Sequence, residues 1–271
     1  MPELPEVETT RRGIAPYVVG ETVNKVIIRE KQLRWPVPAR LNHSLSNSVI
    51  GKLDRRAKYL LFHNQTGCML LHLGMSGSLR IITDNSKPEK HDHVDLVFNA
   101  GHILRFRDPR KFGSIHWTKT DPLEHDLLNH LGPEPLDDEF NAEYLFNKSR
   151  NRSQAIKTFI MDSRIVVGVG NIYASESLFM AGIHPKRKAG KVSFERYELL
   201  VTAIKQVLAS AIKMGGTTLR DFVSGEGKPG YFRNELKVYD RADQPCVVCD
   251  DSIQCIRLGQ RSTYYCKSCQ K

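Results

Sequence analysis

The chain has 271 residues, of which 40% are hydrophobic and 26% charged, and its formal net charge at pH 7 is +10. This length allows two modest domains, and no stretch approaches the about 18 uninterrupted apolar residues of a membrane span. The first twenty residues include acids and Arg11-Arg12 but no apolar centre, so we expect no secretory signal and a cytoplasmic protein. The excess of positive charge favours a polyanionic partner such as nucleic acid.

The first 120 residues are predicted to begin with a helix and to continue as β-strands. The helix runs from Pro5 to about Val19 and is closed by Gly20. Short apolar or alternating runs then predict strands at 23–29, 59–62, 68–73, 78–82, 94–98, 103–107 and 113–118. Residues 99–101 (Asn-Ala-Gly) are typical of a hairpin turn.

The second half is predicted to be helical. Residues 131–138 contain two prolines and a glycine and have the composition of a linker. Helical spacing of apolar residues then predicts helices at 155–161, 171–180 and from a Ser193 cap to Gly215-Gly216. We therefore expect an α+β chain of two lobes, a β lobe and a helical lobe. The predicted boundaries are 1–130, a linker at 131–138, 139–236 and 237–271.

Five of the six cysteines lie near the end of the chain. Four of them form two C-x2-C pairs separated by sixteen residues: Cys246, Cys249, Cys266 and Cys269. This spacing predicts two knuckles joined by a hairpin that bind one Zn²⁺ through four thiolates. Such a site has no open position, so the metal would be structural. Cys68 and Cys255 do not fit the spacing and are expected to be packed thiols.

The start of the chain offers an unusual nucleophile. If Met1 is removed, Pro2 carries a secondary amine that can attack an aldehyde-level carbon and form an iminium, which acts as an electron sink. Three acids follow closely enough for proton transfer: Glu3, Glu6 and Glu8. The structural alternative is a proline that merely precedes a helix.

Taken together, the two ends and the motifs between them resemble the bacterial formamidopyrimidine-DNA glycosylases over essentially the whole chain. The motifs are PELPEVE at the start, RRAKYL at 55–60, HLGMSG at 72–77, KHDH at 90–93, DPRKFG at 108–113, GVGNIYA at 168–174 and the zinc hairpin. The family excises oxidised purines such as 8-oxoguanine. The resemblance implies an N-terminal β-sandwich with a leading helix, and a C-terminal lobe with a helix–two-turn–helix unit and a four-cysteine zinc hairpin.

The same resemblance implies the catalytic residues. Pro2 matches the residue that attacks C1′ of a flipped nucleotide, and the Schiff base that forms supports β- and δ-elimination. Glu3 matches the general acid at the sugar, and Glu6 matches a supporting carboxylate. Lys58 matches the lysine that assists β-elimination, and Arg261 matches the hairpin arginine that grips phosphates and is assigned to δ-elimination.

The implied DNA contacts fall into two groups. A wedge that fills the gap left by base flipping matches Met75, Arg110 and Phe112, and Arg110 can hydrogen-bond the orphaned cytosine. Phosphate contacts match His91, Arg152, Lys157 and Asn171, although the run 148–152 leaves Arg150 as an alternative to Arg152.

Two further segments bear on the resemblance. The polar, glycine-rich stretch 217–231 matches the loop that closes over a flipped purine, although such a stretch is as often a surface turn. Asp240 and Asp250 stand where the family more often has glycine. Both residues tolerate left-handed turns, so we expect only a local change.

The expected function is base excision repair by a bifunctional glycosylase and abasic-site lyase. Its partner would be double-stranded DNA with oxidised purines or abasic sites, bound by a monomer without a membrane. The nearest alternative is a pyrimidine-lesion glycosylase of the endonuclease VIII type, whose start usually reads PEGPE, whereas Leu4 is found here. Intact Pro2, Glu3 and Lys58 oppose a non-catalytic damaged-DNA-binding protein. A tautomerase-type enzyme would have no use for the zinc hairpin.

The charge yields a first prediction. Affinity for a lesion-containing duplex should fall steeply with salt, with a slope of log K against log salt between about −3 and −5, because each neutralised phosphate releases counterions. Fluorescence anisotropy across a potassium chloride series measures this slope. A flat response would show that phosphates are not what the chain binds.

Overall fold

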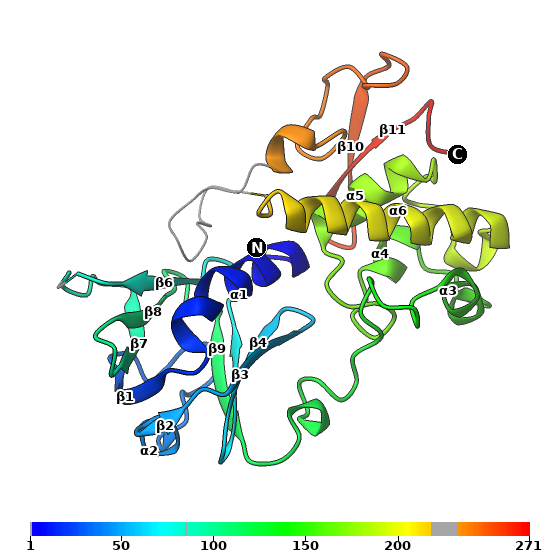
Figure 1. The fold of residues 1–271 in the computed structure, drawn as a ribbon. Helices are drawn as coiled ribbons and strands as arrows, with labels where there is room; N and C mark the ends of the chain where they lie inside the picture. The colour runs from blue at the N-terminus through cyan, green and yellow to red at the C-terminus, as the bar shows by residue number, and fades with distance from the viewer. Residues whose placement is uncertain (1, 85, 218–231) are drawn as a thin grey trace. The chain divides into compact units, whose positions relative to one another are not determined.

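The computed structural model describes residues 2–84, 86–217 and 232–271, and the chain divides into two units (Figure 1). Unit 1 holds residues 1–130 and a segment that begins at Met214, and unit 2 holds residues 131–213 and 232–271. The loop expected over a flipped purine falls, from residue 218 on, outside the described residues. Within them, no helix is long and apolar enough to cross a membrane.

Helix α1 (Leu4–Val18) opens unit 1, as predicted. Glu3 stands at its N-cap in an extended conformation, and Pro5 lies in the first turn, where no backbone N–H is needed. The helix ends just before Gly20, whose φ is +84°. Its apolar side chains Leu4, Val7, Ile14 and Val18 are buried.

Two antiparallel sheets form a β-sandwich in unit 1. One has the strand order β2-β1-β7-β8-β6 and the other β3-β4-β5-β9 (Figure 1). The strands are β1 (Thr22–Ile28), β2 (Ser48–Val49), β3 (Lys52–Arg56), β4 (Tyr59–Asn64), β5 (Gly67–His72), β6 (Ser78–Ile82), β7 (Asp92–Phe98), β8 (Ile103–Arg107) and β9 (Ser114–Thr118). Phe62 and Leu71 of one sheet share a core with Leu96 and Phe106 of the other. A short helix α2 (Leu41–Leu45) and a 3-10 turn η1 (Pro122–Glu124) complete the unit.

The predicted strands are confirmed, whereas β2, β3 and α2 were not predicted. In β3 only Leu53 is buried, and the remaining residues are charged, so the strand shows no clean alternation in sequence. Strand β2 has only two residues and α2 only five, which is too short for a periodic signal.

Two connections between the sheets lie side by side. The chain passes from β5 to β6 through residues 73–77, and from β8 to β9 through residues 108–113. In one sheet β5 pairs with β9, with His72 opposite Ser114. In the other sheet β6 pairs with β8, with Ser78 opposite Arg107. The two crossovers therefore run next to each other in opposite directions.

Unit 2 is helical and ends in a β-hairpin. Its helices are α3 (Ala142–Ser149), α4 (Ile156–Ile160), α5 (Asn171–Met180) and α6 (Phe194–Lys213), with 3-10 turns η2 (Ala189–Lys191) and η3 (Phe232–Glu235). Helix α6 packs against α3 and α5 (Figure 1). The hairpin is β10 (Ile253–Leu258) and β11 (Arg261–Cys266). The predicted helices in α4, α5 and α6 are confirmed, and the polar, eight-residue α3 was not predicted.

Asp240 and Asp250 both adopt left-handed conformations, with φ of 62° and 59°. The expectation that these residues take over left-handed turns is confirmed. Short polar side chains tolerate this region better than other non-glycine residues do, because they can hydrogen-bond to their own backbone.

A buried ion cluster stabilises the five-stranded sheet. Asp95 on β7 is fully buried and accepts hydrogen bonds from Arg29 at 2.6 Å and from Arg105 through two N–H groups at 3.0 Å each. Burial alone would raise the pKa of Asp95, but the two guanidinium groups lower it below its ordinary value.

We predict that Asp95→Ala destabilises the protein by about 3 kcal/mol at pH 7, because it removes the carboxylate that pairs with Arg29 and leaves the buried Arg105 to the more distant Asp92 at 3.7 Å. Since the folded carboxyl has a lowered pKa, this stabilisation is present above about pH 4 and is lost as pH falls further. Urea unfolding at neutral and acid pH checks both points. The exposed Asp126→Ala is the control, and equal stability of both variants at pH 7 would contradict the role of the cluster.

Candidate active site

The carboxylate of Glu6 fixes the start of α1. Its Oε2 accepts the backbone N–H of Glu3 at 2.8 Å, and its Oε1 accepts that of Thr217 at 2.7 Å. Glu6 is 2% exposed and Glu3 3% exposed. One buried carboxylate thus binds two backbone N–H groups, so the residue after Pro2 is held at a defined point of unit 1.

Gly216 makes this clamp possible. It has a φ of +80°, and a Cβ at this position would lie 3.0 Å from Glu6 Oε1. A larger residue would therefore be strained and would also press on the carboxylate. In the sequence, Gly215-Gly216 indicates only the end of a helix, and no local pattern predicts this second role.

Glu8 does not serve as a proton donor. It accepts hydrogen bonds from Arg11 at 2.9 and 3.0 Å, from Arg12 at 2.7 Å and from Arg55 at 3.3 Å. Burial would raise its pKa, but these cations lower it to about 2, so the carboxylate stays ionised at neutral pH. Of the three acids that follow Pro2, Glu8 is therefore a structural anchor.

That anchor also holds the turn that carries Lys58. Arg55, bound to Glu8, donates from Nη1 to the carbonyl of Ala57 at 2.9 Å. Ala57 and Lys58 form the two-residue turn between β3 and β4, and Ala57 has a φ of 54°. The structure thus ties the half-buried Lys58 to α1 through Glu8 and Arg55.

His72 lies between the Lys58 turn and the turn of Met75. Burial and the nearby charges of Lys58 and Arg34 lower its pKa to about 4, so the ring is neutral at pH 7. Its Nδ1 accepts the N–H of Gly74 at 3.0 Å, which leaves the proton on Nε2. The ring also contacts that of Tyr59, with centroids 4.7 Å apart.

The proposed wedge residues sit on the two crossovers of unit 1. Arg110 and Phe112 are exposed and Met75 is half-buried. The Arg110 guanidinium carbon lies 4.9 Å from the centroid of the Phe112 ring, within the range of a cation–π contact. His91, a proposed phosphate contact, is half-buried at the start of β7, with its ring centroid 6.4 Å from that of His93.

In unit 2, the buried Lys157 of α4 links α5 to β11 through its ammonium group. Its Nζ donates to Asn171 Oδ1 at 2.6 Å, to Thr263 Oγ1 at 2.8 Å and to the Ser262 carbonyl at 3.2 Å. Asn171 Nδ2 donates to the same carbonyl at 3.0 Å. The first turns of α4 and α5 are therefore joined to β11, next to Arg261. A direct phosphate contact by Lys157 stays a prediction, while its place at this junction is a finding.

The structure separates the two arginines that the sequence left open. Arg150 donates to the carbonyls of Phe146 and Val192 at 3.1 and 3.0 Å, and its guanidinium lies 3.8 Å from the Phe146 ring centroid. Arg152 is exposed. Because Arg150 is engaged inside unit 2, Arg152 is the better candidate for a phosphate contact. Arg261, at the start of β11, is exposed as well.

Glu176 on α5 organises the approach to the zinc hairpin. Its carboxylate accepts three successive backbone N–H groups, from Lys237 at 2.9 Å, Val238 at 3.0 Å and Tyr239 at 2.8 Å. Burial raises its pKa, and the three amides oppose that effect. These three contacts give Glu176 a structural role.

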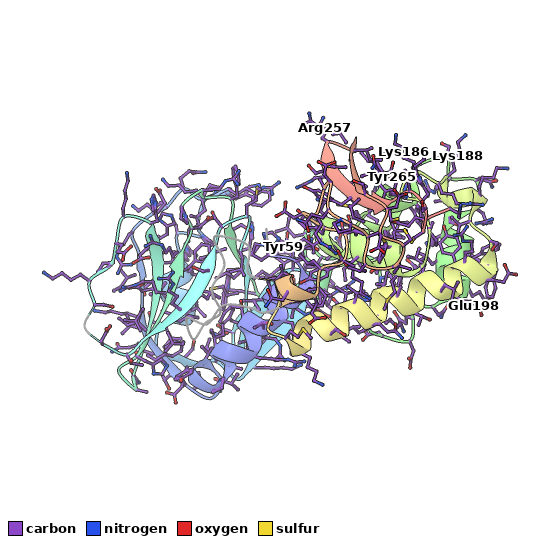
Figure 2. The ribbon with its side chains drawn as sticks, turned by 90° about the horizontal axis from the view of Figure 1, so that it is seen from above. Tyr59, Lys186, Lys188, Glu198, Arg257 and Tyr265 are labelled. Carbon is purple, nitrogen blue, oxygen red and sulfur yellow. The ribbon has the colours of Figure 1, made fainter. Side chains whose placement is uncertain are left out.

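The four predicted zinc cysteines lie together. All four Sγ atoms are within 4.8 Å of one another, with Cys246 to Cys269 at 3.8 Å and Cys249 to Cys266 at 3.5 Å. A tetrahedral site with Zn–S bonds of about 2.3 Å requires sulfurs about 3.8 Å apart. The residues fit one structural Zn²⁺, as predicted. Unit 2 also carries exposed cations, among them Arg257, Lys186 and Lys188 (Figure 2).

Comparison with known proteins gives one consistent result. The formamidopyrimidine-DNA glycosylase N-terminal domain matches residues 1–115, the H2TH domain of these glycosylases matches 131–223, and the zinc finger found in FPG and IleRS matches 243–271. Formamidopyrimidine-DNA glycosylases from Methylococcus capsulatus and Marinobacter nauticus are 57% and 56% identical, each over 271 residues and the whole of both chains.

Solved structures agree. The MutM (Fpg) protein from Thermus thermophilus is 36% identical with a TM-score of 0.88, covering 99% of this chain and 98% of that one. Lactococcus lactis Fpg with an abasic site containing DNA is 33% identical with a TM-score of 0.92, over all of both chains. The chain therefore combines a β-sandwich and its leading helix with a helix–two-turn–helix unit and a zinc hairpin. With the matches above, this combination identifies a DNA glycosylase of base excision repair. The chain belongs to the formamidopyrimidine-DNA glycosylase family.

The zinc hairpin generates a prediction. Its own core is small and includes two of the ligands, Cys246 and Cys266. We expect a strong chelator to release one Zn²⁺ per chain and to abolish DNA binding, because the hairpin cannot fold without the metal. Metal analysis and anisotropy measure this. Cys249→Ser should behave like the chelated protein. The expectation of a packed Cys255 is wrong, because this thiol is exposed, so Cys255→Ser should behave like the wild type. Full binding by metal-free protein would refute the hairpin's role.

Proposed function

We propose that this protein excises oxidised purines, such as 8-oxoguanine and formamidopyrimidines, and then cleaves the abasic site by β,δ-elimination, with Pro2 as the nucleophile. The observation that carries the proposal is the fixed start of α1. Glu6 holds the N–H of Glu3 at 2.8 Å, so the residue before it occupies a defined position rather than a frayed chain end.

The chemistry starts once Met1 has been removed. The Pro2 nitrogen forms a bond to C1′ as the bond from C1′ to the base breaks, and opening of the sugar ring yields an iminium. The C2′ proton becomes acidic because the iminium accepts the electron pair left behind. Its removal expels the 3′ phosphate, a second elimination expels the 5′ phosphate, and water then frees Pro2.

Proton transfers are assigned to side chains of unit 1. Glu3 is proposed as the general acid at the sugar, and Glu6 as the carboxylate that positions it, which its two backbone hydrogen bonds support. Lys58, anchored through Arg55 and Glu8, is proposed to assist β-elimination. Arg261 is proposed to hold phosphate during δ-elimination.

DNA recognition is divided in the same way between residues. Met75, Arg110 and Phe112 are proposed to fill the gap left by the flipped nucleotide. His91, Arg152, Lys157 and Asn171 are proposed to bind the backbone phosphates, and the buried Lys157 would have to exchange one of its three internal acceptors to do so. Exposure of Arg152 and the internal contacts of Arg150 support this choice. Action as a monomer, and in the cytoplasm, remains a prediction.

The lesion class rests on the relatives. Structures of Lactococcus lactis Fpg contain DNA with Fapy-dG or an abasic site, and one contains an oxidised pyrimidine. That last structure keeps oxidised pyrimidines as a second candidate substrate class. Leu4, where the pyrimidine group usually has glycine, favours the purines.

The test is borohydride trapping on duplexes with 8-oxoguanine opposite cytosine, with thymine glycol for comparison. We expect a covalent adduct mainly on the oxidised purine once mass spectrometry shows that Met1 is absent. Pro2→Gly should keep its affinity and lose excision by ~10²-fold or more, as removal of a nucleophile does. The control Pro16→Ala, exposed on the same helix, should trap normally. Unchanged excision by Pro2→Gly would exclude Pro2, and adduct mainly on thymine glycol would establish the pyrimidine class.

A further inference from the structure

The two crossovers of unit 1 are joined by one buried carboxylate. Asp108, fully buried at the start of the second crossover, accepts the hydroxyl of Ser76 from the first at Oδ1, at 2.7 Å. Its Oδ2 accepts the backbone N–H of Gly113 at 2.7 Å. The N–H of Arg110 lies 3.3 Å from both Asp108 Oδ1 and Ser76 Oγ. We call Ser76 and Asp108 the crossover brace.

The backbones of the crossovers also touch directly. Gly74 has a φ of +68°, and a Cβ there would lie 2.4 Å from the carbonyl carbon of Phe112 and from the nitrogen of Gly113. Only glycine fits such an approach. His72, whose Nδ1 accepts the Gly74 N–H at 3.0 Å, also holds this turn.

The backbone of Asp108 extends the brace to the segment of His91. The Asp108 N–H donates to the His91 carbonyl at 3.0 Å, and the Asp108 carbonyl accepts from His93 Nε2 at 2.8 Å. His93 is itself 3% exposed. One buried residue is therefore bonded to the three backbone segments that carry Met75, the pair Arg110 and Phe112, and His91.

The crossover brace is buried, whereas the side chains of Arg110 and Phe112 on the same segments are exposed. Ser76 and Asp108 are 5% and 0% exposed, whereas Arg110 and Phe112 are exposed and stack at 4.9 Å. Inserting side chains into a base stack costs a few kcal/mol for each unstacked step. Three side chains that insert together therefore gain if their mutual spacing is already fixed before binding. Flexible crossovers would lose further conformational entropy on insertion.

We propose that the crossover brace is a positioning device that presents Met75, Arg110 and Phe112 to DNA as one preorganised wedge, and so sets how the enzyme discriminates the base opposite the lesion. Ser76 and Asp108 are positioning residues and touch neither DNA nor the reacting carbon. The inference rests on the proposed function, since it assigns the wedge to the same reaction.

The variants separate the brace from the fold. Ser76→Ala removes the hydroxyl that bridges the crossovers and leaves the Asp108 bond to Gly113. Asp108→Asn keeps the shape but replaces one acceptor oxygen with a donor. The exposed Asp126→Asn is the matched control. If Asp108→Asn fails to fold, Ser76→Ala alone still tests the idea.

Two readouts report on the wedge. With 2-aminopurine beside a tetrahydrofuran abasic site, we expect the fluorescence rise on binding to fall in both brace variants. With 8-oxoguanine, we expect single-turnover excision opposite cytosine to slow by about 10- to 100-fold, the cost of a misplaced group. We also expect the preference for cytosine over adenine opposite the lesion to shrink.

A third readout bypasses the wedge. Borohydride trapping on a single-stranded abasic oligonucleotide needs no base flipping, so the brace variants should trap like the wild type. Unchanged fluorescence and unchanged cytosine preference in Ser76→Ala would overturn the proposal, as would an equal loss of single-strand trapping. Wild-type protein that traps on no substrate would instead reject the Pro2 chemistry itself.

Discussion

The proposed chemistry depends on the hydrogen bond from the Glu3 N–H to the carboxylate of Glu6. A nucleophile at a chain terminus has no covalent support on one side, so its position is set by what holds the next residue. Here a buried acid binds the N–H of Glu3 and, 211 residues away in sequence, that of Thr217. In folded unit 1, the position of the proposed nucleophile therefore depends on Thr217, which binds the same carboxylate as Glu3.

The two units solve the problem of stability differently. Unit 1 buries a continuous apolar core between its sheets, and this core supplies most of its stability. Buried polar residues such as Glu8 and Asp108 fix the position of its turns instead. The zinc hairpin has only a small core, in which Cys246 and Cys266 pack with Ile253, so a bound metal would supply much of its stability. In unit 2 a buried lysine, Lys157, then joins that hairpin to the helices.

Local patterns were enough to predict α1, most strands, three helices and the zinc site from the sequence. Each of these depends on periodicity or spacing within one short, continuous stretch of the chain. The contacts that position the site were not predictable in this way. The bonds from Ser76 to Asp108 and from Lys157 to Thr263 join polar residues 32 and 106 positions apart, and no repeating pattern marks either partner.

The resemblance to the glycosylase family implies roles for individual residues, but it does not describe the contacts that those residues make. It named Glu6 and Lys157, but only the structure shows that Glu6 clamps a helix start and that Lys157 is buried among three acceptors. It also left Arg150 and Arg152 equivalent. The carbonyls around Arg150 distinguish them, because a guanidinium already engaged with protein has fewer donors for phosphate.

The zinc site has one consequence for the conditions in which this protein works. Cys249 is exposed, unlike the buried Cys246 and Cys266, and thiolates are the form of cysteine that peroxides oxidise. Oxidation of that sulfur would remove a ligand and loosen the hairpin. The oxidants that damage guanine would thus also inactivate the protein that repairs it, so repair capacity should depend on the cell's thiol-reducing systems.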